Sequence, residues 1–138
     1  MYDIAIIGGG PAGLAAGLYG ARGGMDTVLL ENMLVGGQIT KTTQVDNYPG
    51  FPDGIDGFAI GTNMQKQAER FGLEIKRTGV DSVELEGEIK RLHCGREVIE
   101  AKAVIIATGA HPKKLGLDRE EKLTGAGVSY CATCDGAF

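Results

Sequence analysis

The sequence lacks an excess of basic residues, a long apolar run and any internal repeat. Its formal net charge is -4 at pH 7, so nothing in the charge balance favours binding to nucleic acid or to an anionic membrane. No apolar run approaches the roughly 20 residues of a spanning helix, so we expect no membrane partner. With 43% hydrophobic and 23% charged residues, the composition is that of an ordinary globular domain.

Cysteine is also scarce. The 3 cysteines are an odd number, which argues against the disulfide framework of a small secreted protein. A strand is expected in the first residues, which leaves no place for a signal peptide and predicts a cytoplasmic protein. In that compartment the Cys131-x-x-Cys134 spacing indicates redox or metal chemistry.

Glycine, in contrast, is abundant, with 23 residues spread through turns. The most informative stretch begins with Ile4–Ile7, a short apolar run typical of a strand buried in a parallel sheet. Gly8, Gly10 and Gly13 follow with the G-x-G-x-x-G spacing, and Pro11 occupies the position at which a helix would begin. We therefore predict a strand, a tight turn and a helix that ends near Gly23–Gly24.

This pattern is typical of a nucleotide-binding turn. Gly8 permits the turn, Gly10 lets the backbone approach a pyrophosphate, and Gly13 lets helix and strand pack closely. A second buried strand, Thr27–Leu30, ends at Glu31, an acidic residue placed to accept hydrogen bonds from a ribose. A glycine-rich turn without a ligand is the alternative, and the loop by itself is equally suited to NAD.

The remaining elements predict an α/β fold. Apolar residues at helical spacing predict a core-facing helix, followed by a parallel strand over Leu73–Lys76. The helical stripe consists of Phe58, Ile60, Met64, Ala68 and Phe71. From Val80 the period changes to two, which predicts a three-stranded antiparallel meander whose last two strands are Ile89–Cys94 and Glu97–Ala101. Ala103–Ala107 then has the pattern of another buried parallel strand.

Two loops could contribute to a site. Residues 32–57 have no clear periodicity, and a loop of this length is usually functional or mobile, although an irregular surface loop is the alternative. Within it, Gly36, Gly37 and Gln38 offer backbone amides and a side-chain amide, and Asn47 offers another side-chain amide. Thr108–Gly109 follows a predicted strand at the carboxyl edge of the sheet, where open α/β sheets bind ligands. The polar and charged composition of residues 113–124 indicates a connecting segment.

Cys131 and Cys134 are spaced so that their sulfur atoms can meet, and a helix N-terminus there would favour the thiolate that performs disulfide exchange. Asp135 could supply or accept a proton. Half of a zinc site and two inert thiols are the alternatives. A zinc site would have to draw on His93, Cys94 and His111, whose spacing is irregular, and we expect His93 and Cys94 to be structural.

Taken together, these motifs resemble the low-molecular-weight, bacterial-type thioredoxin reductases. The resemblance covers essentially the whole chain and is carried by five stretches: residues 8–13, 36–38, 47–51, 107–110 and 128–136. It implies a Rossmann-like FAD-binding three-layer fold with a parallel sheet and a three-stranded antiparallel meander. It also implies that electrons pass from NADPH through FAD to Cys131–Cys134 and then to thioredoxin, in a homodimer.

The resemblance also implies roles for individual residues. Cys134 would face the flavin, Cys131 would attack the thioredoxin disulfide, and Asp135 would handle a proton. The residues that would bind FAD are Gly8, Gly10, Pro11, Ala12, Gly13, Glu31, Gly37, Gln38, Asn47, Val80 (near the adenine), Ala107, Thr108 and Gly109.

One departure from the family pattern is large. No second G-x-G-x-x-G or G-x-G-x-x-A follows a later strand, so no NADPH site is visible. We therefore expect an N-terminal fragment, with residues 1–112 forming part of an FAD-binding domain and residues 113–138 a connector and the start of the redox domain. Such a fragment is expected to be inactive alone. An isolated FAD-binding module, or a reductase of another disulfide protein, are the alternatives.

Overall fold

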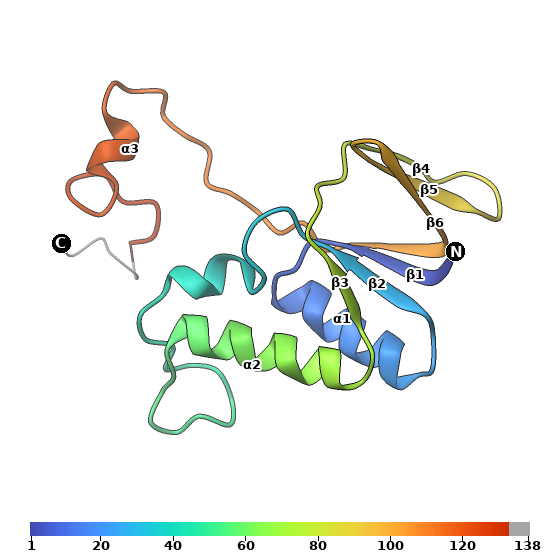
Figure 1. The fold of residues 1–138 in the computed structure, drawn as a ribbon. Coiled ribbons are helices and arrows are strands. Elements are labelled where there is room, and N and C mark those ends of the chain that lie inside the picture. The colour runs from blue at the N-terminus through green and yellow to red at the C-terminus, as the bar shows by residue number, and fades with distance from the viewer. Residues whose placement is uncertain (133–138) are drawn as a thin grey trace.

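A mixed six-stranded sheet organises the chain in a computed structural model that describes residues 1–132 (Figure 1). The elements in chain order are β1 (Tyr2–Ile7), α1 (Pro11–Arg22), β2 (Thr27–Leu30), the 3-10 helix η1 (Gly37–Lys41), α2 (Gly57–Arg70), β3 (Glu74–Lys76), β4 (Ser82–Glu84), β5 (Lys90–Cys94), β6 (Glu97–Ile106) and α3 (Glu120–Leu123).

The strand order is β3-β2-β1-β6-β5-β4, and it confirms the predicted α/β class. β1 pairs in parallel with both β2 and β6, and β2 pairs in parallel with β3. β4, β5 and the first half of β6 form the predicted antiparallel meander. Because Ile7 is in register with both Leu30 and Ile106, three strands end at the same edge of the sheet.

Apolar side chains on the two faces of the parallel strands form two separate cores. On one face, Ile6 and Leu29 pack with Leu14 of α1 and Ala68 of α2. On the other face, the core contains side chains of β1, β2, β5 and β6, namely Ala5, Val28, Leu30, Leu92, Cys94, Ile99 and Ala101. Helices, parallel sheet and meander therefore form the three layers that the resemblance implies, and the meander covers one face of the sheet.

β6 corrects the prediction of two separate strands over Glu97–Ala101 and Ala103–Ala107. It is a single strand of 10 residues that bends sharply, so that its first half belongs to the meander and its second half to the parallel sheet (Figure 1). Ala101 lies at the junction and pairs with both Lys90 and Tyr2. The strand changes partner without a turn, which a change in sequence period cannot reveal.

The second half of β6 is also less buried than its apolar sequence predicts. Ile105 is 37% exposed and Ile106 is 62% exposed. β5 pairs with β6 only over residues 97–101, so within residues 1–132 no strand covers the outer edge of residues 102–106. An exposed apolar strand edge of this kind is a site at which another strand can pair.

Both long helices begin and end near the predicted residues. α1 has Pro11 in its first turn and ends at Arg22, before Gly24 with φ 76°. α2 is capped by the Asp56 carboxylate, which accepts a hydrogen bond from the Ala59 amide at 2.8 Å. Asp at this position satisfies one of the unpaired amides of the first turn.

The prediction that the apolar residues of α2 face the core is wrong at the two ends of the helix. Ile60 and Ala68 are buried, and Met64 is partly buried, but Phe58 is 53% exposed and Phe71 is 39% exposed. Phe58 precedes Ile60 by two residues, which places it about 200° around the helix and away from the core. Phe71 lies beyond the end of α2, where the guanidinium groups of Arg22 and Arg70 lie over its ring at 5.3 and 4.9 Å.

Residues 32–57 are irregular as predicted, apart from η1 and a single bridge between Val45 and Ile55. The segment that follows β6 is extended until α3. Among residues 1–132, no helix has both the length and the apolar character that a membrane crossing requires.

Replacing Gly13 by Ala tests the packing of α1 on β1. A Cβ atom at Gly13 would overlap the carbonyl oxygen of Gly8, a backbone atom that cannot move independently. We expect a loss of about 3 kcal/mol in the free energy of unfolding, measured by urea denaturation.

Gly10→Ala is the matched control. The nearest atom to a Cβ there is the Cα of Gly37 at 3.9 Å, and the φ of Gly10 is -75°, which an Ala residue adopts readily. Its cost should stay within about 1 kcal/mol. Equal stability of the two variants would contradict the packing argument.

Candidate functional site

The turn between β1 and α1 is fixed by backbone contacts. Gly8 has φ 107°, and its amide donates to the Leu30 carbonyl at 2.9 Å. A Cβ atom at Gly8 would overlap the carbonyl oxygen of Ala107, just as one at Gly13 would overlap Gly8. Glycine is therefore required here because three backbone segments lie against one another.

A second loop, residues 36–38, lies against this turn. The Gly36 amide donates to the Gly9 carbonyl at 2.8 Å. Gly37 has φ 67°, and a Cβ atom there would lie 2.8 Å from the Cα of Gly10. The two glycine-rich segments, far apart in sequence, are thus in direct backbone contact at the carboxyl edge of the sheet.

The segment that follows β6 completes this edge. The Ala107 amide donates to the Ile7 carbonyl at 2.8 Å, so Ala107 continues the pairing of β6 with β1. The Gln38 side-chain amide donates to the Ala110 carbonyl at 3.1 Å. Thr108 and Gly109 lie between these two contacts and are exposed.

Glu31 is bound to the same turn by its carboxylate. One carboxylate oxygen accepts from the Gly9 amide at 2.8 Å, and the other accepts from the Met33 amide at 2.8 Å. Because a carboxylate has about four lone-pair positions, two remain for another donor. Glu31 is partly exposed, so a ligand can reach it.

The edge fits the phosphate and ribose of a dinucleotide. The space above Gly10 is open to a ligand, since a Cβ atom there meets only the Cα of Gly37 within 4 Å. Gly10, the N-cap residue of α1, provides no side-chain cap, and the amides of Ala12 and Gly13 belong to the first turn, where no intrahelical acceptor exists. These amides, the positive end of the helix dipole and the Glu31 carboxylate form a suitable donor and acceptor set.

Two of the predicted FAD-binding residues, Asn47 and Val80, make none of the contacts described for the β1–α1 turn. Asn47 is exposed in the loop whose Tyr48 and Phe51 line an apolar groove of about 310 Å³ over α1 and α2. Val80 packs against the core on the meander side. A Cβ atom at the preceding Gly79 would lie 3.4 Å from the Asn32 Cβ atom, so Val80 follows a segment that runs beside the end of β2.

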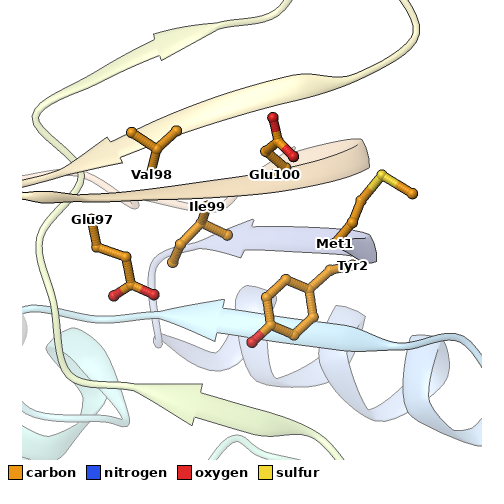
Figure 2. Close-up of a pocket in the computed structure, with 6 residues that line it drawn as sticks. All are labelled: Met1, Tyr2, Glu97, Val98, Ile99 and Glu100. Carbon is orange, nitrogen blue, oxygen red and sulfur yellow. The ribbon is translucent and has the colours of Figure 1, made fainter.

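A larger cavity lies at the opposite end of β1. It has a volume of about 450 Å³ and lies between the first residues of the chain and the start of β6 (Figure 2). Its lining residues are Met1, Tyr2, Glu97, Val98, Ile99 and Glu100. Its carboxylates disfavour a phosphate, and one of them, on Glu97, already pairs with Lys76 at 2.6 Å.

Of the predicted redox residues, the structure describes Cys131, which is disulfide-bonded and whose amide donates to the Ser129 hydroxyl at 3.2 Å. Cys134 and Asp135 lie outside the described residues.

Cys94 is a free thiol that is 5% exposed, and burial raises its pKa, so its position is structural as expected. His93 pairs with Glu84 at 2.8 Å. Within residues 1–132, no group of three His, Cys, Asp or Glu side chains could hold a metal ion.

Three residues of the edge lie within the stretches that carry the resemblance but were not among the predicted FAD contacts. Gly9, Gly36 and Ala110 each contribute a backbone hydrogen bond that joins two segments of the edge. The signal for Gly9 was available in principle, because parallel pairing of β1 with β2 places Gly9 and Glu31 at the same edge. The acceptor role of Ala110 could not be predicted, because every residue has a backbone carbonyl group and only the fold brings this one to Gln38.

Comparison with known proteins extends these observations. The chain matches the family model described as pyridine nucleotide-disulphide oxidoreductase over residues 2–138. It is 53% identical to a thioredoxin reductase of Peptoclostridium litorale, over all of this chain and 44% of the relative. Among solved structures it is similar to the thioredoxin reductase of Streptococcus pyogenes (44% identity, TM-score 0.86, covering 100% of this chain and 45% of that one). It is likewise similar to the thioredoxin reductase of Lactococcus lactis (42% identity, TM-score 0.84, covering 100% and 45%).

Glu31→Gln tests the attachment of the glycine turn. The amide keeps one acceptor but turns its NH2 group toward one of the two backbone donors, so one hydrogen bond is lost. An unpaired buried donor costs about 1–3 kcal/mol, which applies to the Gly9 amide, whereas the exposed Met33 amide can bind water instead. In either case the amide that loses its acceptor should exchange hydrogen at least tenfold faster.

The control is Glu74→Gln, which changes an exposed carboxylate of the same sheet that accepts from the Tyr2 hydroxyl. It should leave exchange at Gly9 and Met33 unchanged. Wild-type exchange at both amides in Glu31→Gln would show that the carboxylate does not hold the turn.

Proposed function

The chain belongs to the pyridine nucleotide-disulphide oxidoreductase family, and on that basis we propose that its glycine-lined edge binds FAD and its cysteine pair reduces a protein disulfide. The observation that carries the proposal is the backbone contact of residues 8–13, 36–38 and 107–110 at one edge of the sheet. In this arrangement the first-turn amides of α1 have no intrahelical acceptor, the space above Gly10 is open, and Glu31 is partly exposed. Bound FAD supplies two-electron chemistry that amino-acid side chains lack.

We assign the adenosine half of FAD to the β1–α1 turn. The amides of Ala12 and Gly13 bind the pyrophosphate, and the open face of Gly10 lets it approach. Glu31 accepts from the ribose, and Val80 lies toward the adenine. The remaining FAD contacts in this proposal are Gly8, Pro11, Gly37, Gln38, Asn47, Ala107, Thr108 and Gly109.

The dithiol chemistry is a pair of balanced exchanges. The Cys131 thiolate attacks one sulfur of the partner's disulfide, forms a mixed disulfide and expels the other sulfur as a thiolate. The Cys134 thiolate then attacks the Cys131 sulfur, which closes the Cys131–Cys134 disulfide and releases the second partner thiol. Two electrons pass to the partner, and Asp135 exchanges a proton with the thiol groups.

For the whole protein we propose reduction of thioredoxin with NADPH as the electron source. The chain spans less than half the length of the thioredoxin reductases that it matches, so this activity is assigned to a longer polypeptide. Residues 1–112 contribute to its FAD-binding domain, and residues 113–138 form the connector and the start of the redox domain. We place it in the cytoplasm, because a dithiol that must be returned to its reduced state suits a reducing compartment. The homodimer that the resemblance implies is part of the same proposal.

The second candidate is an FAD-binding module without turnover, favoured by the missing second glycine motif. Mixing the 138-residue chain with FAD and NADPH distinguishes a reductase from an FAD-binding module without turnover. Loss of flavin absorbance at enzyme-like rates would exclude the module. A different disulfide protein as partner would be revealed if that protein, but not thioredoxin, oxidised the reduced dithiol.

Gly10→Ala tests the FAD site without disturbing the fold. A methyl group on Gly10 projects into the space assigned to the pyrophosphate, so the Kd for FAD should rise at least tenfold. Isothermal titration calorimetry on the 138-residue chain measures this change.

Gly87→Asn is the control for that titration. Gly87 has φ 78° and no neighbour within 4 Å of a Cβ atom, and Asn tolerates this conformation. FAD should bind this variant as it binds the wild-type chain. Unchanged affinity in Gly10→Ala would contradict the assignment of the site.

Cysteine variants test the order of the exchanges. In Cys134→Ser the mixed disulfide cannot be resolved, so the reduced chain should accumulate a covalent complex with oxidised thioredoxin. Non-reducing gel electrophoresis measures this complex.

Cys131→Ser should form no such complex, and Cys94→Ser, which alters the buried thiol, should behave as the wild-type chain. A complex that forms through Cys94, or equally through both residues of the pair, would refute the assignment.

A further inference from the structure

The segment that carries Cys131 forms its own hydrogen-bonded unit, which we call the Cys131 segment (residues 114–131). It follows the extended chain after β6 and stands apart from the sheet (Figure 1). α3 and its flanking turns make up most of it, and it contains a polar side chain that is nearly inaccessible to solvent. That side chain is Glu120, which is 4% exposed.

The Glu120 carboxylate is surrounded by backbone donors from the residues just before α3. It accepts from the amides of Leu115 at 2.8 Å, Gly116 at 2.7 Å and Leu117 at 3.1 Å. Three charge-assisted hydrogen bonds to one side chain fix the turn over residues 115–117. The adjacent Arg119 has φ 66°, the only such value for a non-glycine residue within residues 1–132, and the turn must hold it there.

Further contacts extend this order toward the cysteine. The Glu120 carbonyl accepts from the Thr124 hydroxyl at 3.0 Å. The Leu123 carbonyl at the end of α3 accepts from the amides of Ala126 and Val128, both at 2.9 Å. Thr124 and Val128 also form a β-bridge, and Val128 is followed by Ser129, whose hydroxyl accepts from the Cys131 amide.

We propose that Glu120 is a positioning residue for the attacking thiol, because its carboxylate closes the turn at residues 115–117 and thereby orders the chain from α3 to Cys131. The inference rests on the redox role proposed for Cys131. Glu120 acts at a distance, through α3 and the Thr124–Val128 bridge. Its neighbour Glu121 is exposed and pairs with Lys114, so the two adjacent carboxylates have different tasks.

The electrostatics of Glu120 agree with this role. Hydrogen bonds from the Leu115, Leu117 and Gly116 amides, with the charge of Lys114, lower the pKa of the Glu120 carboxyl despite its desolvation, and Glu121 is the other charged group nearby. A carboxyl with a lowered pKa stabilises the folded segment above its unfolded pKa. That contribution is lost as the pH falls through the folded pKa.

The test compares Glu120→Gln with Glu121→Gln in the 138-residue chain. The first readout is amide hydrogen exchange at Leu115, Gly116, Leu117 and Val128, with Ile6 and Leu29 as reporters of the sheet. The second readout is the pH profile of iodoacetamide alkylation at Cys131 after reduction, followed by peptide mass spectrometry. The redox role proposed for Cys131 requires a thiolate near neutral pH, whereas a cysteine freed from a fixed environment returns to a pKa of about 8.5.

In Glu120→Gln we expect exchange in the Cys131 segment to become at least tenfold faster, with the sheet unchanged. Alkylation of Cys131 at pH 7 should slow by roughly tenfold, which corresponds to one pKa unit. Glu121→Gln should match the wild-type chain in both readouts. Glu120→Asp, which keeps the charge but shortens its reach, should give intermediate values, and it supplies the test if Glu120→Gln also loses protection in the sheet.

Unchanged exchange in Glu120→Gln overturns the proposal. Faster exchange with a wild-type alkylation profile also overturns it, because Glu120 would then hold the local fold without affecting the thiol. If Cys131 of the wild-type chain already reacts like a free cysteine, the redox role fails first and this inference fails with it.

Discussion

Backbone-to-backbone contact at the carboxyl edge of the parallel sheet is the constraint on which the rest of this structure depends. Gly8 lies against Ala107, Gly13 lies against Gly8, and Gly37 lies against Gly10, with no side chain between them. Parallel pairing of β1 with β2 and β6 brings these segments to one edge. The absence of side chains at these glycines then lets the three backbone segments pack directly against one another.

The same glycines therefore serve the fold and the site in different ways. Gly8 and Gly13 are required by packing, because a Cβ atom at either position overlaps a backbone oxygen. Gly10 is required by the proposed ligand, since the fold leaves open space above it. Stability and the proposed FAD binding should therefore be separable at the level of single residues, although the residues belong to one motif.

Burial and hydrogen bonding differ along the chain, as the two halves of β6 and the Cys131 segment show. The first half of β6 completes the meander core through Ile99 and Ala101, while the second half leaves Ile106 exposed. Beyond it, order depends on local hydrogen bonds such as those to Glu120, since the segment stands apart from the sheet. The glycine-lined edge is thus built on the parallel sheet, whereas Cys131 lies in a segment whose described hydrogen bonds are local.

The sequence alone determined the α/β class, the glycine turn after β1, the acidic residue after β2 and the cysteine spacing, because each is a local pattern of a few neighbouring residues. Tertiary structure decided what local patterns do not contain. The bend that gives β6 two partners, the exposure of Phe58 and Ile106, and the two amides bound by Glu31 depend on neighbours far along the chain. Burial and hydrogen bonding of such groups are set by which segments meet in space, and that is fixed only when the whole sheet has formed.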